Sequence, residues 1–137
     1  MKEILNNEFA SVFFDETSNS IITVWKKAPM SEEYRGICNF ILQKIKEFGV
    51  DAIINDIYYQ GLVGTENHIW LQNEIVPEVF RAGVSKVAIV APNDVFSRFY
   101  IENVKNCARS GLTDVEISYF NDLISAQAWL LREVVPA

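Results

Sequence analysis

The stretch SEEYRGICNFILQKIKEFGVDAII, Ser31 to Ile54, decides the fold of this chain. Its first part predicts a helix that Ser31 would cap and Gly49 would stop. Ala52–Ile54 is short and apolar on both sides, as expected of a strand that is covered on both faces. An amphipathic helix followed by a buried strand indicates an α/β protein. The helix rests on an apolar stripe with spacings of three and four residues, formed by Tyr34, Ile37, Cys38, Ile41, Leu42, Ile45 and Phe48.

The segments on either side continue this alternation of strands and helices. Upstream, residues 8–14 and 20–26 are rich in β-branched and aromatic types and flank the turn formers DETSN, which predicts a β-hairpin. Downstream, a second helix is expected from about Thr65 to Ala82, with a kink or a restart at Pro77. Lys86 to Ala91 then reads as another buried strand.

The C-terminal third predicts three more elements. A third helix is expected to begin at Asn93 or Asp94 and to end near Gly111. Residues 115–119 alternate between apolar and polar, which predicts an edge strand, and Asn121 would cap a final helix. We therefore predict one α/β domain over residues 1–137, with a five-stranded, mostly parallel sheet, an N-terminal β-hairpin and about four helices.

Composition excludes several functions. A net charge of −6 and a pI near 4.8 argue against nucleic-acid binding and against docking on anionic lipid. The N-terminus lacks the unbroken apolar stretch of a signal peptide, and no apolar run approaches the ~20 residues of a membrane span. A cytoplasmic protein is expected. Cys38 and Cys107 lack metal-type spacing and are interpreted as small buried hydrophobes, with no metal site.

Three stretches of this chain resemble the SpoIIAA-like family of STAS domains (sulfate transporter and anti-sigma-factor antagonist), and more closely the small bacterial STAS-like proteins. They are VWKKAPMSEEYRG with the hairpin before it, WLQNEIVPEVFRAGVSKVAIVAPNDVF, and EISYFNDLISAQAWL. The resemblance implies a right-handed β/α superhelix with strands in nearly sequential order and the first strand added antiparallel. It also implies a regulatory module that binds another protein.

In true antagonists of this family, a serine in an Asp-Ser pair is phosphorylated at the start of the helix after the central strand. Thr65 matches that position, follows Gly64 and is not part of such a pair. Thr65 is thus the candidate phosphoacceptor that the resemblance implies. Its residue type and position favour a helix cap, with the hydroxyl accepting a hydrogen bond from the backbone N–H of Asn67 or His68.

The catalytic alternatives are incomplete. Asp56 follows a central strand, as the phosphoacceptor of a two-component receiver does, with Asp15-Glu16 as its acidic pair, but the remaining receiver residues are missing. Hydrogen bonding within the loop is the preferred role for Asn55 and Asp56. His68 has no serine or cysteine partner in a recognisable motif and is expected at or near the surface. We predict a protein that is not an enzyme and has no cofactor, since a sequential strand order offers no dinucleotide crevice.

An aromatic group suggests where a ligand or partner would bind. Tyr58, Tyr59 and Trp70 form the densest aromatic group in the chain, near the carboxyl end of the central strand. The sequence therefore predicts a non-catalytic protein-interaction or regulatory module, with a small apolar ligand or lipid at this aromatic group as the alternative. Trp25 could join the same surface, and the high aromatic content suggests self-association as a homodimer. The predicted surface comprises Asn55, Asp56, Tyr58, Tyr59, Thr65, His68 and Trp70.

Overall fold

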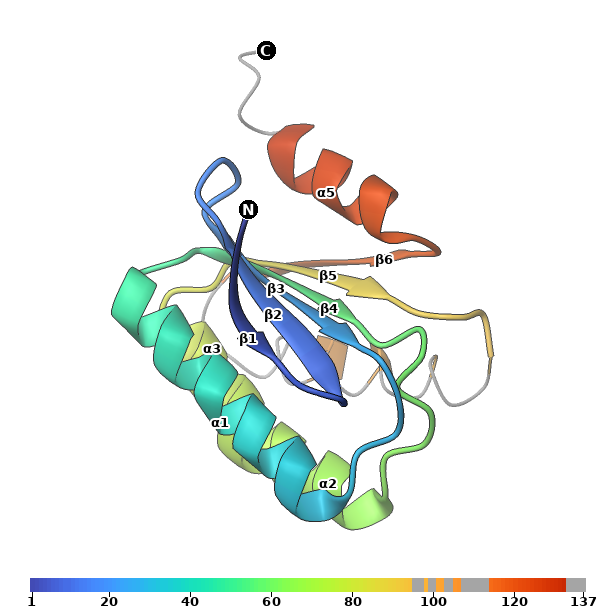
Figure 1. The fold of residues 1–137 in the computed structure, drawn as a ribbon. Coiled ribbons are helices and arrows are strands. Elements are labelled where there is room, and N and C mark those ends of the chain that lie inside the picture. The colour runs from blue at the N-terminus through green and yellow to red at the C-terminus, as the bar shows by residue number, and fades with distance from the viewer. Residues whose placement is uncertain (95–97, 99–100, 103–104, 107–113, 133–137) are drawn as a thin grey trace.

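The protein is built around one twisted β-sheet, seen in a computed structural model that describes residues 1–94, 98, 101–102, 105–106 and 114–132 (Figure 1). Within these residues the sheet has six strands, and their order in the sheet is their order in the chain. β1–β2 and β2–β3 are antiparallel, and the pairs from β3 to β6 are parallel. The strands are β1 (Lys2–Asn6), β2 (Ala10–Asp15), β3 (Ser20–Trp25), β4 (Ala52–Asp56), β5 (Lys86–Val90) and β6 (Glu116–Phe120).

The α/β class is confirmed, and so is the hairpin, which β2 and β3 form. The predicted number of five strands is wrong, because β1 adds a sixth strand at the N-terminal edge. A β-bulge between Glu3 and Leu5 hides this strand from pattern analysis. The bulge lets the neighbouring residues Ile4 and Leu5 pack against the same core, so that the period of two is lost.

Helix α1 (Ser31–Phe48) forms as the apolar stripe predicts and ends at Gly49, whose positive φ of 63° suits glycine. Its start differs from the prediction by one residue. The N-cap is Met30, whose carbonyl accepts from the N–H of Tyr34 at 2.9 Å. Ser31 already has helical geometry and serves another contact, described below.

The second helical segment is continuous but changes its winding. It consists of α2 (Thr65–Trp70), a π-helical turn η1 (Leu71–Ile75) and α3 (Val76–Arg81). The π turn ends two residues before Pro77, which has no N–H and crowds the carbonyl four residues back. The restart expected at Pro77 therefore takes the form of a wider turn.

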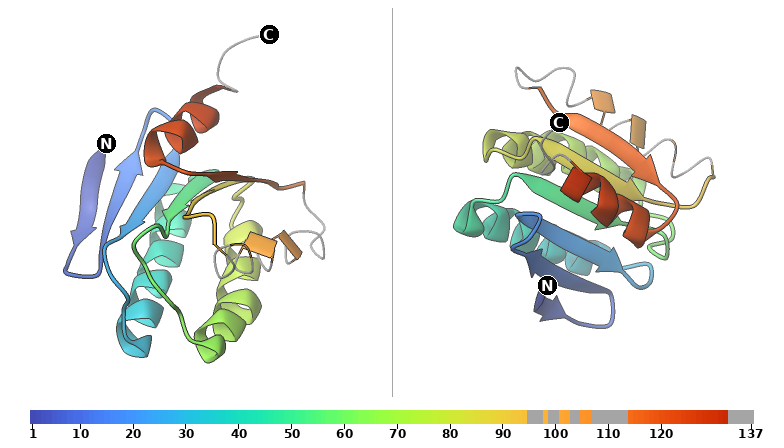
Figure 2. Two further views of the ribbon diagram at one scale, coloured as in Figure 1. Left: turned by 90° about the vertical axis from the view of Figure 1, so that its right-hand side faces the viewer. Right: turned by 90° about the horizontal axis from the view of Figure 1, so that it is seen from above.

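Helices cover both faces of the sheet (Figure 2). α1 and the α2–α3 segment lie on one face, and α5 (Leu123–Arg132) lies on the other, over β4, β5 and β6. The predicted edge strand is confirmed as β6. Asn121 does not cap α5, because the N–H of Ser125 donates to Oδ1 of Asp122 at 2.8 Å. A third helix was predicted from Asn93 or Asp94 to Gly111, and most of that segment lies outside the described residues. Cys107 also lies outside them.

Candidate functional site

The loops that follow β3 and β4 meet at one end of the sheet. A Cβ built on Gly61 would lie 3.2 Å from Cβ of Ala28, which places the loop of residues 57–64 directly against the loop of residues 26–30. Gly61 also has a φ of +71°, a conformation that favours glycine. The candidate site residues lie in these loops, at the end of β4 and along α2.

Asn55 and Asp56 belong to β4 and not to the loop after it, so they point to opposite faces of the sheet. Asn55 lies on the α1 face, where its Oδ1 accepts from Nε1 of Trp25 at 3.0 Å. Asp56 is buried on the α5 face, and its Oδ1 accepts from the N–H of Tyr58 at 3.1 Å. Burial raises the pKa of the Asp56 carboxyl, and the Tyr58 hydrogen bond opposes this in part.

The topology separates the carboxylates that a receiver site would need to bring together. Asp15 ends β2, which runs antiparallel, and it pairs with Ser20 at the start of β3. Asp56 pairs with Val24 near the other end of β3. Asp15 instead holds its own turn, accepting from the N–H of Thr17 and from the hydroxyl of Ser18. The two acids therefore lie toward opposite ends of the sheet and cannot share a magnesium ion.

The three aromatic residues predicted to form one group are divided between two. Tyr58 and Tyr59 pack on each other in the loop, with ring centroids 5.1 Å apart, and are 42% and 68% exposed. Trp70 is half-buried and meets Tyr34 edge-on at 6.2 Å, while Tyr34 stacks on Trp25 at 5.5 Å. Trp25, Tyr34 and Trp70 thus form a row on the α1 face, and the tyrosine pair stays at the surface.

Thr65 does not act as the helix cap. The cap residue is Gly64, whose extended backbone lets its carbonyl accept from the N–H groups of Asn67 and His68 at 3.0 and 3.1 Å. Thr65 is the first residue of α2 and is exposed, so its hydroxyl is accessible for modification. His68 is half-buried, and burial lowers the pKa of its imidazole.

The sequence did not reveal a polar contact that joins α1 to α2. Asn67 is buried; its Oδ1 accepts from Nε of Arg35 at 2.9 Å, and its Nδ2 donates to Oγ of Ser31 at 2.8 Å. The guanidinium of Arg35 also lies 5.0 Å from the ring centroid of Trp70. Asparagine is a weak helix former. Its presence inside the short helix α2 is the sequence signal that could have identified Asn67 as a buried contact residue.

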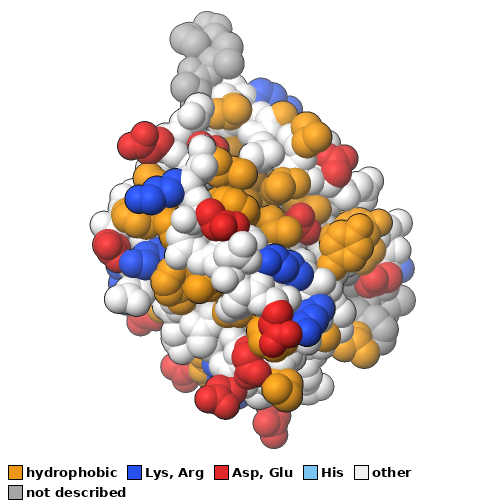
Figure 3. Space-filling model, viewed as in Figure 1, with side chains coloured by type: hydrophobic (Ala, Val, Ile, Leu, Met, Phe, Trp, Pro, Cys, Tyr) orange, Lys and Arg blue, Asp and Glu red, His pale blue; other side chains and the backbone are white. Residues whose placement is uncertain are grey.

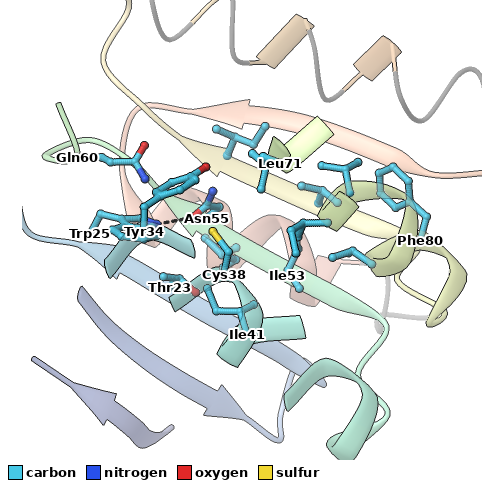
Figure 4. A pocket seen from close by; sticks show the side chains of 16 residues that line it. Thr23, Trp25, Tyr34, Cys38, Ile41, Ile53, Asn55, Gln60, Leu71 and Phe80 are labelled. Atoms are coloured by element: carbon cyan, nitrogen blue, oxygen red, sulfur yellow. Dashed lines mark hydrogen bonds between the residues drawn. The ribbon is translucent and has the colours of Figure 1, made fainter. Parts of the chain in front are cut away.

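A cavity of about 70 Å³ lies between the sheet and the helices of the α1 face (Figure 4). At one end Trp25, Tyr34, Asn55 and Gln60 come together, and at the other end Phe80 lies beside apolar side chains. Tyr58, Tyr59 and Trp70, where an apolar pocket was predicted, do not line it. The lining also includes Thr23, Cys38, Ile41, Ile53, Ile54, Leu71, Ile75, Val76, Val79, Val87 and Ile89.

Cys38, whose side chain lines the middle of this cavity, is a buried thiol and not a reactive one. Burial raises its pKa to about 12, against a smaller lowering by a hydrogen bond with Tyr34. The thiol is therefore protonated at neutral pH, as expected of a small buried hydrophobe.

Comparison with known proteins assigns no family. No protein-family model, no curated protein and no solved structure matches the chain. Within the described part of the chain, no three His, Cys, Asp or Glu residues are grouped so that they could hold a metal ion. No helix among the same residues has the length and apolar character needed to cross a membrane. The resemblance to STAS-like proteins stays a prediction.

Proposed function

We propose that this chain is a non-catalytic protein-interaction module of the STAS-like, SpoIIAA-like type, and that its partner binds at the loops that follow β3 and β4. The sequential strand order with parallel pairing from β3 to β6 supports this assignment. The right-handed β/α superhelix of that family is part of the proposal.

One observation carries the choice of surface. Four large apolar side chains are exposed on the two adjoining loops, with exposed fractions of 42–68%: Met30, Tyr58, Tyr59 and Leu62. We call these four residues the loop surface. Its position at the carboxyl end of parallel strands is where α/β proteins commonly bind their partners and ligands. Exposed tyrosines suit an interface, because each provides apolar area together with a hydrogen-bonding hydroxyl.

Charge narrows the kind of partner. Acidic side chains gather where α1 and α2 begin, at the lower end of the view in Figure 3, and they include Glu32, Glu33 and Glu66. Elsewhere on the face shown, charges of both signs are mixed with hydrophobic side chains. A partner that offers apolar side chains flanked by lysine or arginine would complement this end of the molecule.

The candidate chemical groups do not converge, which supports a non-catalytic role. Cys38 is protonated inside the α1 face, Asp56 points to the opposite face, and His68 lies on α2. A nucleophile, its base and an orienting acid would need to lie within hydrogen-bond reach of one another.

The test is recovery of a partner by affinity purification, with a photo-crosslinking residue at position 59 in a parallel sample. The double variant Tyr59→Ser with Leu62→Ser should lose the partner, because both side chains are largely exposed and contribute little to folding. Ile124→Ser is the matched control, since Ile124 is 79% exposed on α5. A partner that survives the double variant, or that is lost equally in the control, would refute the loop surface as the binding site.

Self-association as a homodimer is part of this proposal. A second copy would then be what the crosslinker at position 59 captures, and light scattering would give twice the chain mass of 15.6 kDa. A monomer mass at high micromolar concentration contradicts the dimer and leaves a different protein as the partner.

A further inference from the structure

The cavity on the α1 face has the properties of a small-molecule site. Most of its wall is hydrocarbon from β4, β5 and the α2–α3 segment, including Ile53, Leu71, Ile75, Val79, Phe80 and Val87, and Phe80 lies at the end away from Gln60. A single water needs at least about 10–15 Å³, so a volume of about 70 Å³ is large enough for a chain of several carbon atoms. Water in such an apolar space is poorly hydrogen-bonded and is readily displaced by an apolar molecule.

The helix departs from regular α geometry where it borders this cavity. Leu71 and Ile75, the first and last residues of the π turn η1, both line the wall. A π turn is wider than an α turn, and such turns occur often at functional sites. Pro77 accounts for the irregularity itself, and the consequence is that two large side chains flank an open space.

Gln60 provides a polar group at the other end. The residue is 3% exposed, and its side chain lies beside Tyr34 and Trp25 at the end of the cavity (Figure 4). Among the residues that the structure describes, none forms a hydrogen bond with the side-chain amide of Gln60. Every described side-chain nitrogen or oxygen that is sealed from solvent does have a partner, so the amide of Gln60 is not sealed. The amide of Gln60 borders the cavity beside Tyr34, where it can donate and accept hydrogen bonds.

The lining defines the charge of the ligand. None of the side chains that line the cavity carries a charge, and the thiol of Cys38 is protonated. A carboxylate or an amine would be buried without a counter-ion, which is costly, whereas a hydroxyl or carbonyl group matches the amide of Gln60. The indole N–H of Trp25 already donates to Asn55. The hydroxyl of Thr23 also lines the cavity, and Gln60 is the polar group at the end where its side chain lies beside Tyr34.

From this geometry we infer that the cavity binds a small uncharged amphipathic molecule, with its hydrocarbon chain along the apolar wall and its hydroxyl or carbonyl group hydrogen-bonded to Gln60. This site is separate from the loop surface: Gln60 points inward from the same loop that carries Tyr58, Tyr59 and Leu62 at the surface.

A series of straight-chain alcohols from 1-butanol to 1-octanol tests the inference by isothermal titration calorimetry on the whole chain. We expect saturable binding at one site, tightening about fourfold with each added methylene until the cavity is full. Hexanoate at pH 7.4 should bind at least tenfold more weakly than 1-hexanol. Absence of saturable alcohol binding, or equal binding of hexanoate and 1-hexanol, would overturn the proposal.

Two variants locate the site. Val79→Phe places a ring in the cavity and should abolish 1-hexanol binding, while the exposed control Ile124→Ser should bind as the wild type does. Gln60→Met keeps the side-chain length and removes the amide; it should weaken 1-hexanol about tenfold and leave benzene binding unchanged. Unchanged 1-hexanol binding in Val79→Phe refutes the cavity as the site, and unchanged binding in Gln60→Met refutes the head-group contact. Thermal unfolding of each variant shows that it is folded.

Discussion

The two faces of the sheet are packed in different ways. On the α5 face, Ile22 and Ile54 pack with small residues, Ala52 and Ala88 on the strands and Ala126 on α5, and larger side chains such as Phe120 and Trp129 pack against this cluster while partly exposed. Small residues let a helix lie close to the strands and leave little unfilled space. The α1 face holds large side chains from two helical segments, together with a cavity and a polar group at its end.

This difference in packing suggests that the α5 face stabilises the sheet and that the α1 face provides space for a ligand. Close packing on the α5 face stabilises the sheet and makes that face sensitive to any change of volume. The α1 face keeps unfilled volume and an amide that borders it, both of which reduce stability unless a ligand fills them. The predictions below test this division, from the largest expected effect to the smallest.

Leu130→Ala should cost about 2–5 kcal/mol of unfolding free energy, because Leu130 is buried and anchors α5 on the sheet. Urea unfolding followed by circular dichroism measures this change. Ile124→Ala on the same helix is the control and should change stability by no more than about 0.5 kcal/mol, since its side chain is 79% exposed. A similar effect of both variants would show that α5 does not stabilise the sheet through Leu130.

Adding volume should have opposite results on the two faces. Ala88→Leu overfills the α5 face and should destabilise the protein by about 1–3 kcal/mol. Val79→Ile adds one methylene at the cavity and should be neutral or stabilising by up to about 0.8 kcal/mol. Chemical denaturation of both variants measures the contrast. A loss in Val79→Ile as large as that in Ala88→Leu would show that the cavity cannot accept added atoms.

Asp56→Asn tests the buried carboxyl on the α5 face. Because burial raises the folded-state pKa, the folded protein holds this proton more tightly than the unfolded chain does. The resulting stabilisation is fully present below the unfolded pKa of about 3.9 and is lost as pH rises through the folded pKa. The stability of the wild type minus that of Asp56→Asn, from urea unfolding between pH 3 and 7, should therefore fall as pH rises.

Asp122→Asn gives the opposite sign and serves as the control. The backbone and side-chain hydrogen bonds with Ser125 lower the pKa of Asp122, so its stabilisation is present above the unfolded pKa and is lost as pH falls. The difference between wild type and Asp122→Asn should therefore grow with pH. If Asp56 showed the same slope as Asp122, its carboxyl would be stabilised in its charged form and the burial argument would fail.

Thr65→Ala, at the start of α2 on the α1 face, should have the smallest effect. Since the carbonyl of Gly64 already accepts from the first free N–H groups, the change should stay within about 0.5 kcal/mol. A cap at Thr65 would instead contribute about 1 kcal/mol. Asp122→Ala removes a side-chain cap from α5. Thermal unfolding of the two variants should show a larger loss of stability in Asp122→Ala than in Thr65→Ala. Phosphorylation at Thr65, detectable by mass spectrometry of the protein from cells, stays a separate prediction.

The regular elements could be predicted because their signals are local and repeated. The stripe from Tyr34 to Phe48 spans about four turns of α1, and the apolar runs of β4 and β5 are short and continuous. The α/β class and most helix and strand positions follow from such patterns. The strand β1 does not, because its bulge breaks the period that identifies a strand.

The helix caps and the cavity depend on information that no local pattern contains. The predicted caps Ser31, Thr65 and Asn121 are each displaced by one residue, because capping depends on the backbone conformation of a single position. The cavity joins Trp25 on β3, Tyr34 on α1 and Gln60 on a loop, which only the folded chain brings together. The prediction of one aromatic group was wrong for the same reason, because Trp70 packs against Tyr34 and not against the pair Tyr58 and Tyr59.

The sequential order of the strands has a consequence for how the chain assembles during synthesis. Each strand pairs with the one made immediately before it, so no strand has to enter between two that are already joined. The four strands β1 to β4 are complete once residue 56 has left the ribosome, and each later strand extends the same growing edge (Figure 1). The antiparallel pairs β1–β2 and β2–β3 close short loops, which favours their rapid formation, whereas each parallel pair from β3 to β6 closes across a longer crossover. A nascent chain of this protein can therefore fold in the direction in which it is translated, with α5 closing the second face last.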